Sequence, residues 1–345
     1  MAGIALAFVG AAFLLPFLAP DNETVRNFSV IFSSIILEAM PFMLLGTLIG
    51  GLIEVFVSRE RMDSLSPNNS LASACLAAGM GVIFPVCECA IVPVVRRLAG
   101  KGLPAAAAIA YLLAGPMVNP VVGFSTAMAY NLDWRPVVVR LGFGYVIAVG
   151  VALLMERFFA RSSLFVPEIA GATSRHAHGH DHSHEPPKEP QHDHGHGCGC
   201  GCGKTQGTAG KMVAACNHAL DDFMATAPFL VAGAALATVA QVCLERRLFV
   251  DLASSPLASS AVMMLLAVLL NLCSEADAFI AASFQGLVPF SAQMAFLVIG
   301  PMFDIKLLLM YRNLFKAREI PLLAALVSIA VLLMSALLEV LGVGI

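Results

Sequence analysis

One motif occurs twice in this chain, as Gly115-Pro116-Met117-Val118-Asn119-Pro120 and as Gly300-Pro301-Met302-Phe303-Asp304-Ile305. Both copies lie inside long apolar runs, where glycine and proline weaken or interrupt a helix. Two further pairs keep nearly the same spacing: Met40-Pro41-Phe42 matches Ala227-Pro228-Phe229, and Ser70-Leu71-Ala72-Ser73 matches Pro256-Leu257-Ala258-Ser259. The three offsets are 185, 187 and 186 residues. This agreement predicts an internal duplication with a broken helix at the same place in each copy.

The composition is that of a membrane protein. Hydrophobic residues make up 59% of the 345 residues and charged residues only 12%, against about 25% charged in soluble domains. The net charge of −3 and the lack of a basic run argue against a nucleic-acid partner. Six of the nine cysteines are scattered through or beside apolar segments, unlike a disulfide framework. We therefore predict an all-α polytopic membrane protein, in contact with lipid and with reduced thiols.

Apolar runs of roughly 20 residues can cross the hydrocarbon core of a bilayer. The first run, at residues 2–19, lacks the basic start of a signal peptide, so we expect an anchor helix. Eight further runs follow, at residues 28–57, 71–95, 104–130, 136–159, 212–244, 256–285, 288–311 and 321–341. About nine transmembrane helices are predicted, within a range of eight to ten.

Four units follow from this pattern: an anchor at residues 1–20, a membrane repeat at 21–160, a linker at 161–211 and a second repeat at 212–345. Four helices per repeat give both halves the same orientation, whereas a re-entrant pair in each would change that parity. Lysine and arginine are divided too evenly between the loops on the two sides for the positive-inside rule to indicate the orientation. Duplicated halves with broken helices are typical of secondary transporters, whose site lies between the repeats and whose repeats move against each other.

The sharpest candidate site is Pro85-Val86-Cys87-Glu88-Cys89. Alternate residues of a helix point about 200° apart, but in an unwound segment Cys87 and Cys89 lie on one side. The flanking Pro85 and Pro93 favour such unwinding. Glu88 supports a substrate role because a carboxylate inside a membrane segment is costly. The alternative is that both cysteines simply pack as small apolar residues in a kinked helix.

The second repeat places Cys273, Glu275 and Asp277 at the corresponding position. On a helix Cys273 and Asp277 share a face, whereas in an unwound segment all three side chains share one side. Two acids so close inside an apolar run repel each other unless a cation or a proton lies between them. Cation binding or proton coupling is therefore predicted, with capping of backbone donors as the alternative.

The duplicated motif supplies a third candidate pair, Asn119 and Asp304, at equivalent positions. Their side chains and the backbone carbonyls freed at the breaks could coordinate a cation, and Met117 and Met302 could add thioethers. Packing is the simpler role for the methionines. Lys306 could neutralise Asp304, although a spacing of two is wrong for a same-face pair on a helix.

A proton relay or a point of cargo access is the fourth candidate, at Glu38, His218 and Asp222. They lie near the equivalent Pro41 and Pro228, and the two residues of the second repeat are four apart on one helix face. They could equally be interfacial residues facing water. Arg140 and Glu54 are expected near the headgroups or in structural pairs.

The linker carries a metal-binding tract between His176 and Cys202. Imidazole and thiolate bind zinc and copper, and the tract offers His176, His178, His180, His182, His184, His192, His194, His196, Cys198, Cys200 and Cys202. Its prolines and glycines predict a disordered loop, and Cys-Gly-Cys-Gly-Cys is not the spacing of a structural zinc site. We expect an accessory metal-binding loop that indicates the cargo, and that docks a metal chaperone or senses metal.

These motifs resemble those of the bacterial predicted-permease family that includes the organoarsenical efflux permeases. The resemblance rests on residues 86–90, 115–120, 274–277 and 300–304 and covers both repeats. The inserted His/Cys tract is similar to that of the branch described as copper/zinc efflux transporters. The resemblance implies a multi-pass permease of the bacterial inner membrane without an ATPase module, and the chain indeed has no Walker-type motif.

The sequence therefore predicts a transporter and not an enzyme: a secondary permease, coupled to protons, that exports a soft or borderline metal ion. Cys87, Cys89 and Cys273 would coordinate the ion. Copper or zinc is favoured as the transported or loop-bound ion, and no obligatory cofactor is expected. A trivalent organoarsenical is the alternative cargo, because arsenic(III) favours thiolates. A membrane thiol oxidoreductase or metal-delivery scaffold is the alternative of another class, and a partner subunit remains open.

Overall fold

The computed structural model describes residues 23–56, 67, 69–158, 165, 208–243 and 255–342. These residues form helices without a β-sheet; one isolated bridge joins Phe165 to Phe315. The expected anchor at residues 1–20 and the His/Cys tract lie outside the described residues. Helices are favoured because a chain in hydrocarbon must satisfy its backbone hydrogen bonds internally.

The first repeat contains two long helices and, between them, two pairs of short ones. Its helices are α2 (Glu23–Phe56), α4 (Ser70–Ile83), α5 (Glu88–Gly100), α6 (Ala105–Ala114), α7 (Pro120–Ala129) and α8 (Trp134–Phe158). The second repeat has the same order: α10 (Thr208–Cys243), α12 (Pro256–Leu270), α13 (Ser274–Ala282), α14 (Phe290–Met302), α15 (Ile305–Met310), the 3-10 turn η1 (Tyr311–Asn313) and α16 (Glu319–Val340).

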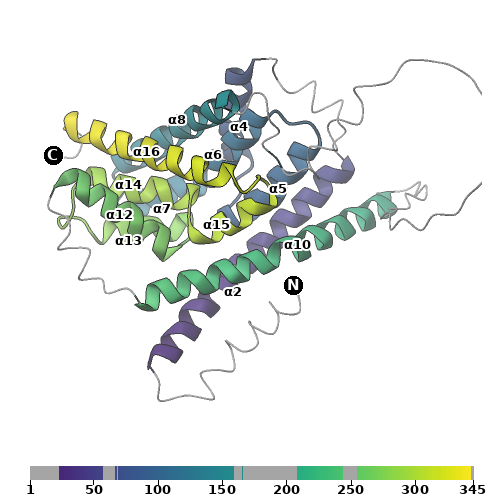
Figure 1. Ribbon diagram of the computed structural model, residues 1–345, viewed down its shortest axis with the longest axis horizontal. Coiled ribbons are helices and arrows are strands. Elements are labelled where there is room, and N and C mark those ends of the chain that lie inside the picture. Colours follow the sequence, from purple (N-terminus) through teal and green to yellow (C-terminus); the bar gives the residue numbers. More distant parts are fainter. Residues whose placement is uncertain are drawn as a thin grey trace, which may run out of the picture.

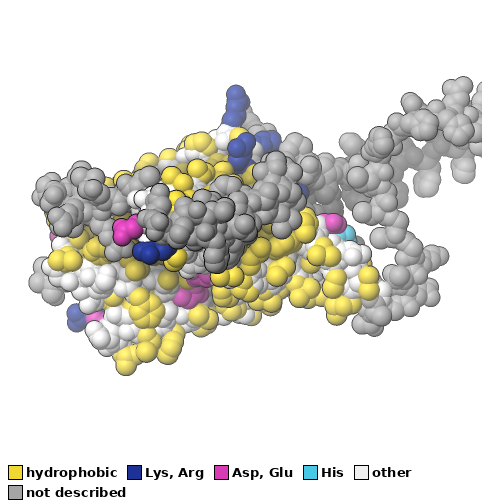
Figure 2. Space-filling model, turned by 90° about the horizontal axis from the view of Figure 1, so that it is seen from below, with side chains coloured by type: hydrophobic (Ala, Val, Ile, Leu, Met, Phe, Trp, Pro, Cys, Tyr) yellow, Lys and Arg dark blue, Asp and Glu magenta, His cyan; other side chains and the backbone are white. Residues whose placement is uncertain are grey.

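All eight runs expected after the anchor coincide with these elements. Four runs are single long helices, and four are pairs of short helices separated by a break. Among the described residues, five segments are long and apolar enough to cross a membrane: Glu23–Phe56, Trp134–Phe158, Gly210–Val239, Phe290–Asn313 and Glu319–Val340. The surface agrees with this, since hydrophobic side chains cover most of the described face in Figure 2.

The breaks lie where the sequence places proline and polar caps. Asn119 caps α7 by accepting a hydrogen bond from the Val122 amide, and Pro120 occupies the first turn. Asp304 caps α15 in the same way through the Leu307 amide. Asn271 ends α12 in the left-handed conformation, with φ of 51°, which asparagine tolerates better than most residues. The breaks are therefore encoded locally and equivalently in both repeats.

The long helices α2 and α10 pack against each other in opposite directions. Phe32, early in α2, clusters with Ala234, late in α10, while Gly51 lies against Ala215, early in α10. In Figure 1 the pair crosses along one side of the remaining helices. Because α2 and α10 are equivalent in the duplication, the axis that relates them is perpendicular to both. If both span the membrane, that axis lies in the membrane plane and the repeats have opposite orientations.

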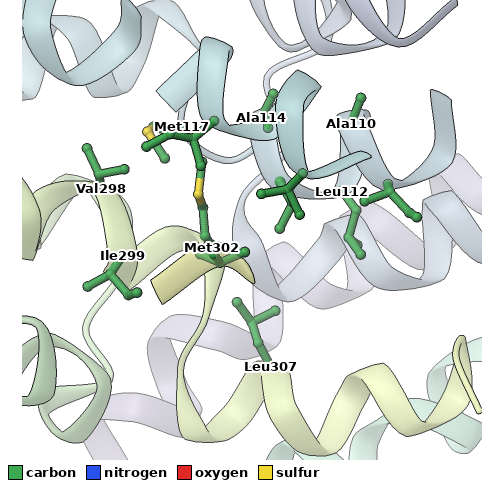
Figure 3. Packing of buried hydrophobic residues seen from close by; sticks show 14 of the residues in the cluster. Ala110, Leu112, Ala114, Met117, Val298, Ile299, Met302 and Leu307 are labelled. Carbon is green, nitrogen blue, oxygen red and sulfur yellow. The ribbon is translucent and has the colours of Figure 1, made fainter. Parts of the chain in front are cut away.

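The remaining helices form one core. Equivalent contacts recur in both repeats: α4 packs on α6 and α12 on α14, while α6 packs on α8 and α14 on α16. The repeats meet where α7 packs on α13, where α5 meets α15, and where α8 packs on α16. Met117 and Met302, the equivalent methionines of the two motifs, are both fully buried in this core (Figure 3). Packing is therefore their structural role.

Candidate functional site between the repeats

The starts of α5 and α13 are the centre of the candidate site. Cys87 precedes α5 in an extended conformation (φ −73°, ψ 166°), and Cys273 precedes α13 in nearly the same one (φ −79°, ψ 156°). Neither thiol caps its helix. The unwinding expected from Pro85 is thus present, and it places the two equivalent cysteines outside the regular helices.

A cavity of about 280 Å³ lies between α2 and these two helix starts. Seven of the residues singled out from the sequence line it: Glu38, Cys87, Glu88, Cys89, Cys273, Glu275 and Lys306. Apolar side chains of α2, among them Ile31, Ile35 and Phe42, form the opposite wall. The structure therefore brings together residues from helices that are far apart in the chain.

The thiols at the cavity form two separate pairs of neighbours. Cys87 and Cys89 are neighbours at the start of α5, and both line the cavity. Cys273 is instead a neighbour of Glu38 on α2. In the part of the chain that the structure describes, no three His, Cys, Asp or Glu side chains are close enough together to hold a metal ion. A three-thiol site therefore requires Cys273 to approach the other pair.

Lys306 occupies the centre of a buried charge cluster. Its Nζ lies 2.8 Å from Glu88 Oε1 and 3.7 Å from Asp304 Oδ2. All three side chains are at most 3% exposed. The expected pairing of Lys306 with Asp304 is thus present but is the longer of the two contacts. Sequence spacing suggested no link to Glu88, because the two residues belong to different repeats.

Arg140 is a second buried basic side chain, and of the two positions expected for it, near the headgroups or in structural contacts, it occupies the second. It is fully buried, and its guanidinium donates to the Thr126 hydroxyl and to the Ser274 carbonyl oxygen, each at 2.8 Å. It thereby ties α7 and α8 of the first repeat to the start of α13. The sequence signal for this position is a charged residue within an apolar helix, because such a residue is costly in a membrane segment unless it has partners.

Asp277 lies behind the cavity wall and does not line it. Its side chain is 1% exposed, and Oδ2 has no hydrogen-bond partner. The same oxygen faces the backbone of Gly300, where a Cβ atom would lie only 2.5 Å away. Of the two arrangements expected, the unwound one, with Cys273, Glu275 and Asp277 on one side, is not present: the helix α13 begins at Ser274 and turns Asp277 into the protein.

The duplication axis passes through the site. Glu88 and Ser274 occupy equivalent positions, and the Ser274 hydroxyl donates to Glu88 Oε2 across 3.3 Å. Cys87 and Cys273 are likewise equivalent and line the same cavity. Residues related by a twofold axis can touch only beside that axis. The cavity is therefore built from both repeats at their common centre.

The remaining candidates lie elsewhere. Asp222 accepts a hydrogen bond from Arg97 Nε at 2.6 Å, and the His218 carbonyl oxygen accepts one from the same guanidinium. Glu38 lies at the cavity instead, so the three proposed relay residues are not brought together. Asn119 is buried and its side chain is occupied in capping α7. Neither it nor Asp304 lines the cavity.

Comparison with known proteins gives the family. Residues 24–340 match the ArsP_1 family, described as predicted permeases. The chain belongs to this permease family. The match covers both repeats and every helix described here, so the duplicated architecture and the central cavity are properties of a predicted permease.

Two relatives support the assignment. The UPF0718 protein YcgR of Bacillus subtilis (strain 168) is 35% identical over 90% of this chain and 96% of its own length. A Streptococcus mutans serotype c (strain ATCC 700610 / UA159) protein, named as a subunit of a two-component membrane permease complex, is 33% identical over 86% of this chain and 90% of its own. No solved structure matches with significance. The chain is thus a multi-pass membrane protein of a permease family.

Proposed function

We propose that this permease exports a soft or borderline metal ion, with copper or zinc as the favoured cargo, across the bacterial inner membrane. The observation that carries the proposal is the central cavity, which Cys87, Cys89 and Cys273 line together with the carboxylates of Glu38, Glu88 and Glu275. Thiolates select soft and borderline metals. The His/Cys tract of the linker supports copper or zinc, because imidazole suits both ions.

The charge cluster suggests how a cation is received. Lys306 neutralises Glu88 within the cavity, so an incoming cation competes with the ammonium group for that carboxylate. Glu275 faces the cavity as well and is not paired with a lysine or arginine among the described contacts. We propose that the carboxylates exchange the metal for protons, which makes export dependent on a proton gradient.

A trivalent organoarsenical is the second candidate cargo. Arsenic(III) favours thiolates, and three thiols line the cavity. The apolar wall formed by α2 suits the organic group of such a compound. A second subunit is a further part of the proposal, because one relative is named as belonging to a two-component permease complex.

Transport by the purified full chain in liposomes tests these proposals. Zinc, copper(I) and a trivalent methylarsenical are offered in turn, with and without a proton gradient, and movement across the bilayer is followed. We expect flux of at least one of them, loss of that flux in the Cys87→Ser/Cys89→Ser double variant, and normal flux in Cys216→Ser, whose thiol is exposed on α10 away from the cavity. Binding without flux would indicate a delivery scaffold, and unchanged flux in the double variant would rule out the thiol site.

A further inference from the structure

The pair α2–α10 breaks the symmetry that the rest of the fold obeys. In the described residues α2 packs extensively on α5, and α10 on α15. The duplication relates α5 to α13 and α15 to α7. No comparable packing of α10 on α13, or of α2 on α7, is present among the described helices. The pair therefore covers one of two equivalent surfaces and leaves the other uncovered.

Both long helices use the same small-residue face for this packing. Gly46 lies directly against Ala90 of α5, and a Cβ at Gly233 would lie 2.7 Å from the Lys306 Cα of α15. These two glycines are equivalent, with an offset of 187 residues. The duplication carries Ala90 to Ala276 and Lys306 to Val121.

The equivalent surface is available. Val121 and Phe124 on α7 are 52% and 63% exposed, and Phe279 on α13 is 55% exposed. Their equivalents in the covered surface are shielded: Lys306 is only 3% exposed, and Pro93, the equivalent of Phe279, is buried.

We propose that the outer face of α7 and α13 is a second packing surface, or seat, for the α2–α10 pair. The present seat is the face of α5 and α15, and the pair moves between these two equivalent seats. In the second seat Gly46 packs on Val121 and Gly233 packs on Ala276. The inference rests on the internal duplication and does not depend on the cargo.

This movement changes the side of the membrane from which the cavity is accessible. In the present seat Leu230 of α10 packs against Cys89, while Glu38 of α2 faces Cys273 across the cavity. In the second seat Met43, the equivalent of Leu230, closes over Glu275, and α10 opens from Cys89. Because the two repeats have opposite orientations, the opening then faces the other side of the membrane.

Charged contacts hold the present seat. Arg97 of α5 binds Asp222 of α10 at 2.6 Å and lies 3.8 Å from Glu54 of α2. The equivalent positions are Ser283, Ile35 and Gln241, which carry no charge. The second seat lacks this ion-pair cluster. The free energy that the cluster contributes to the present seat therefore determines how often the second seat is occupied.

Photo-crosslinking in membranes tests the second seat. Phe279 is replaced by the photoreactive benzoylphenylalanine in the full chain, without added metal, and adducts are mapped by mass spectrometry. We expect adducts on α10 near Ala237, because their equivalents Pro93 and Gly50 are neighbours here, with a Gly50 Cβ 3.7 Å from the Pro93 carbonyl oxygen. The Arg97→Gln background should increase these adducts by about tenfold, since it leaves a buried Asp222 unpaired in the present seat.

The control places the same analogue at Leu333, which is 66% exposed on α16 and is covered in neither seat. It should give no adduct with α2 or α10. If Arg97→Gln does not yield folded protein by size exclusion, Asp222→Asn replaces it under the same criterion. Adducts of position 279 with lipid alone, with a second copy or with another polypeptide, in both backgrounds, would overturn the proposal. Crosslinking is read without cargo, so a failed transport assay leaves this result independent.

Discussion

The Ser274 hydroxyl donates a hydrogen bond to the Glu88 carboxylate across 3.3 Å, and these two residues hold the same position in the two repeats. The contact locates the twofold axis at the cavity. It also connects the buried basic side chains Lys306 and Arg140, because Glu88 binds Lys306 while the Ser274 carbonyl oxygen binds Arg140. The candidate site and the interface between the repeats are therefore formed by the same residues.

Removing the ammonium group at the centre of this structure should destabilise the fold. Lys306→Gln leaves Glu88 buried and unpaired, which typically costs about 3–5 kcal/mol. We expect a large fall in the unfolding midpoint measured in detergent. The Glu88→Gln/Lys306→Gln double variant should recover much of the loss, because neither charge then remains. A double variant as unstable as the sum of the two single variants would contradict the pairing.

Arg140 should be needed for the start of α13 to keep its place. Arg140→Gln loses charged hydrogen bonds to the Thr126 hydroxyl and the Ser274 carbonyl oxygen, each of which contributes about 1.5–3 kcal/mol. The unfolding midpoint should fall. Arg135→Gln, on the same helix but exposed, is the matched control and should leave the midpoint nearly unchanged. Equal effects of the two variants would argue against a structural role of Arg140.

Gly300 should not tolerate a methyl group. In Gly300→Ala the new Cβ would meet Asp277 Oδ2 at 2.5 Å, and overpacking of this kind costs about 1–3 kcal/mol. Gly142→Ala is the control, because nothing lies within 4 Å of a Cβ there and alanine favours a helix over glycine by about 0.5–1 kcal/mol. Comparing the two unfolding midpoints checks the prediction: the first should fall and the second should stay or rise.

The His/Cys tract should bind metal without being required for transport. Its eleven ligands suffice for about two tetrahedral ions. Replacing residues 176–202 by a Gly/Ser linker of equal length should therefore lower the zinc bound per chain in equilibrium dialysis by about two ions. Flux into liposomes at saturating metal should persist. Loss of flux with retained zinc binding would reverse the assignment and place the tract in the transport path.

Local sequence signals predicted the breaks, whereas the charge partners depend on tertiary structure. Proline and polar caps act on neighbouring residues, so the ends of helices at Cys87, Asn119, Cys273 and Asp304 could be inferred. The spacing argument against a pair of Asp304 and Lys306 assumed a continuous helix. Asp304 instead is the extended cap of α15 (φ −135°, ψ 176°), and the 3.7 Å approach becomes possible.

The contacts of Lys306 with Glu88 and of Arg140 with Ser274 join different repeats, at separations of 218 and 134 residues. The hydrophobic periodicity within one segment cannot predict a contact between segments that are so far apart in the chain. The same limit applies to Asp277. Its side was inferred for an unwound chain, but only the structure shows that α13 begins three residues earlier and carries the carboxylate inward.

The meeting of Glu88 with Ser274 has a consequence for the repulsion between like charges. In a dimer of two identical halves, every group beside the axis is present twice, so a carboxylate there faces a second carboxylate, and the two resist ionising together. Fusing the halves into one chain removes that constraint. Here one acid faces one hydroxyl, and one lysine stands where the other half has Val121. A single chain can thus hold a carboxylate at its centre without an equivalent acid opposing it.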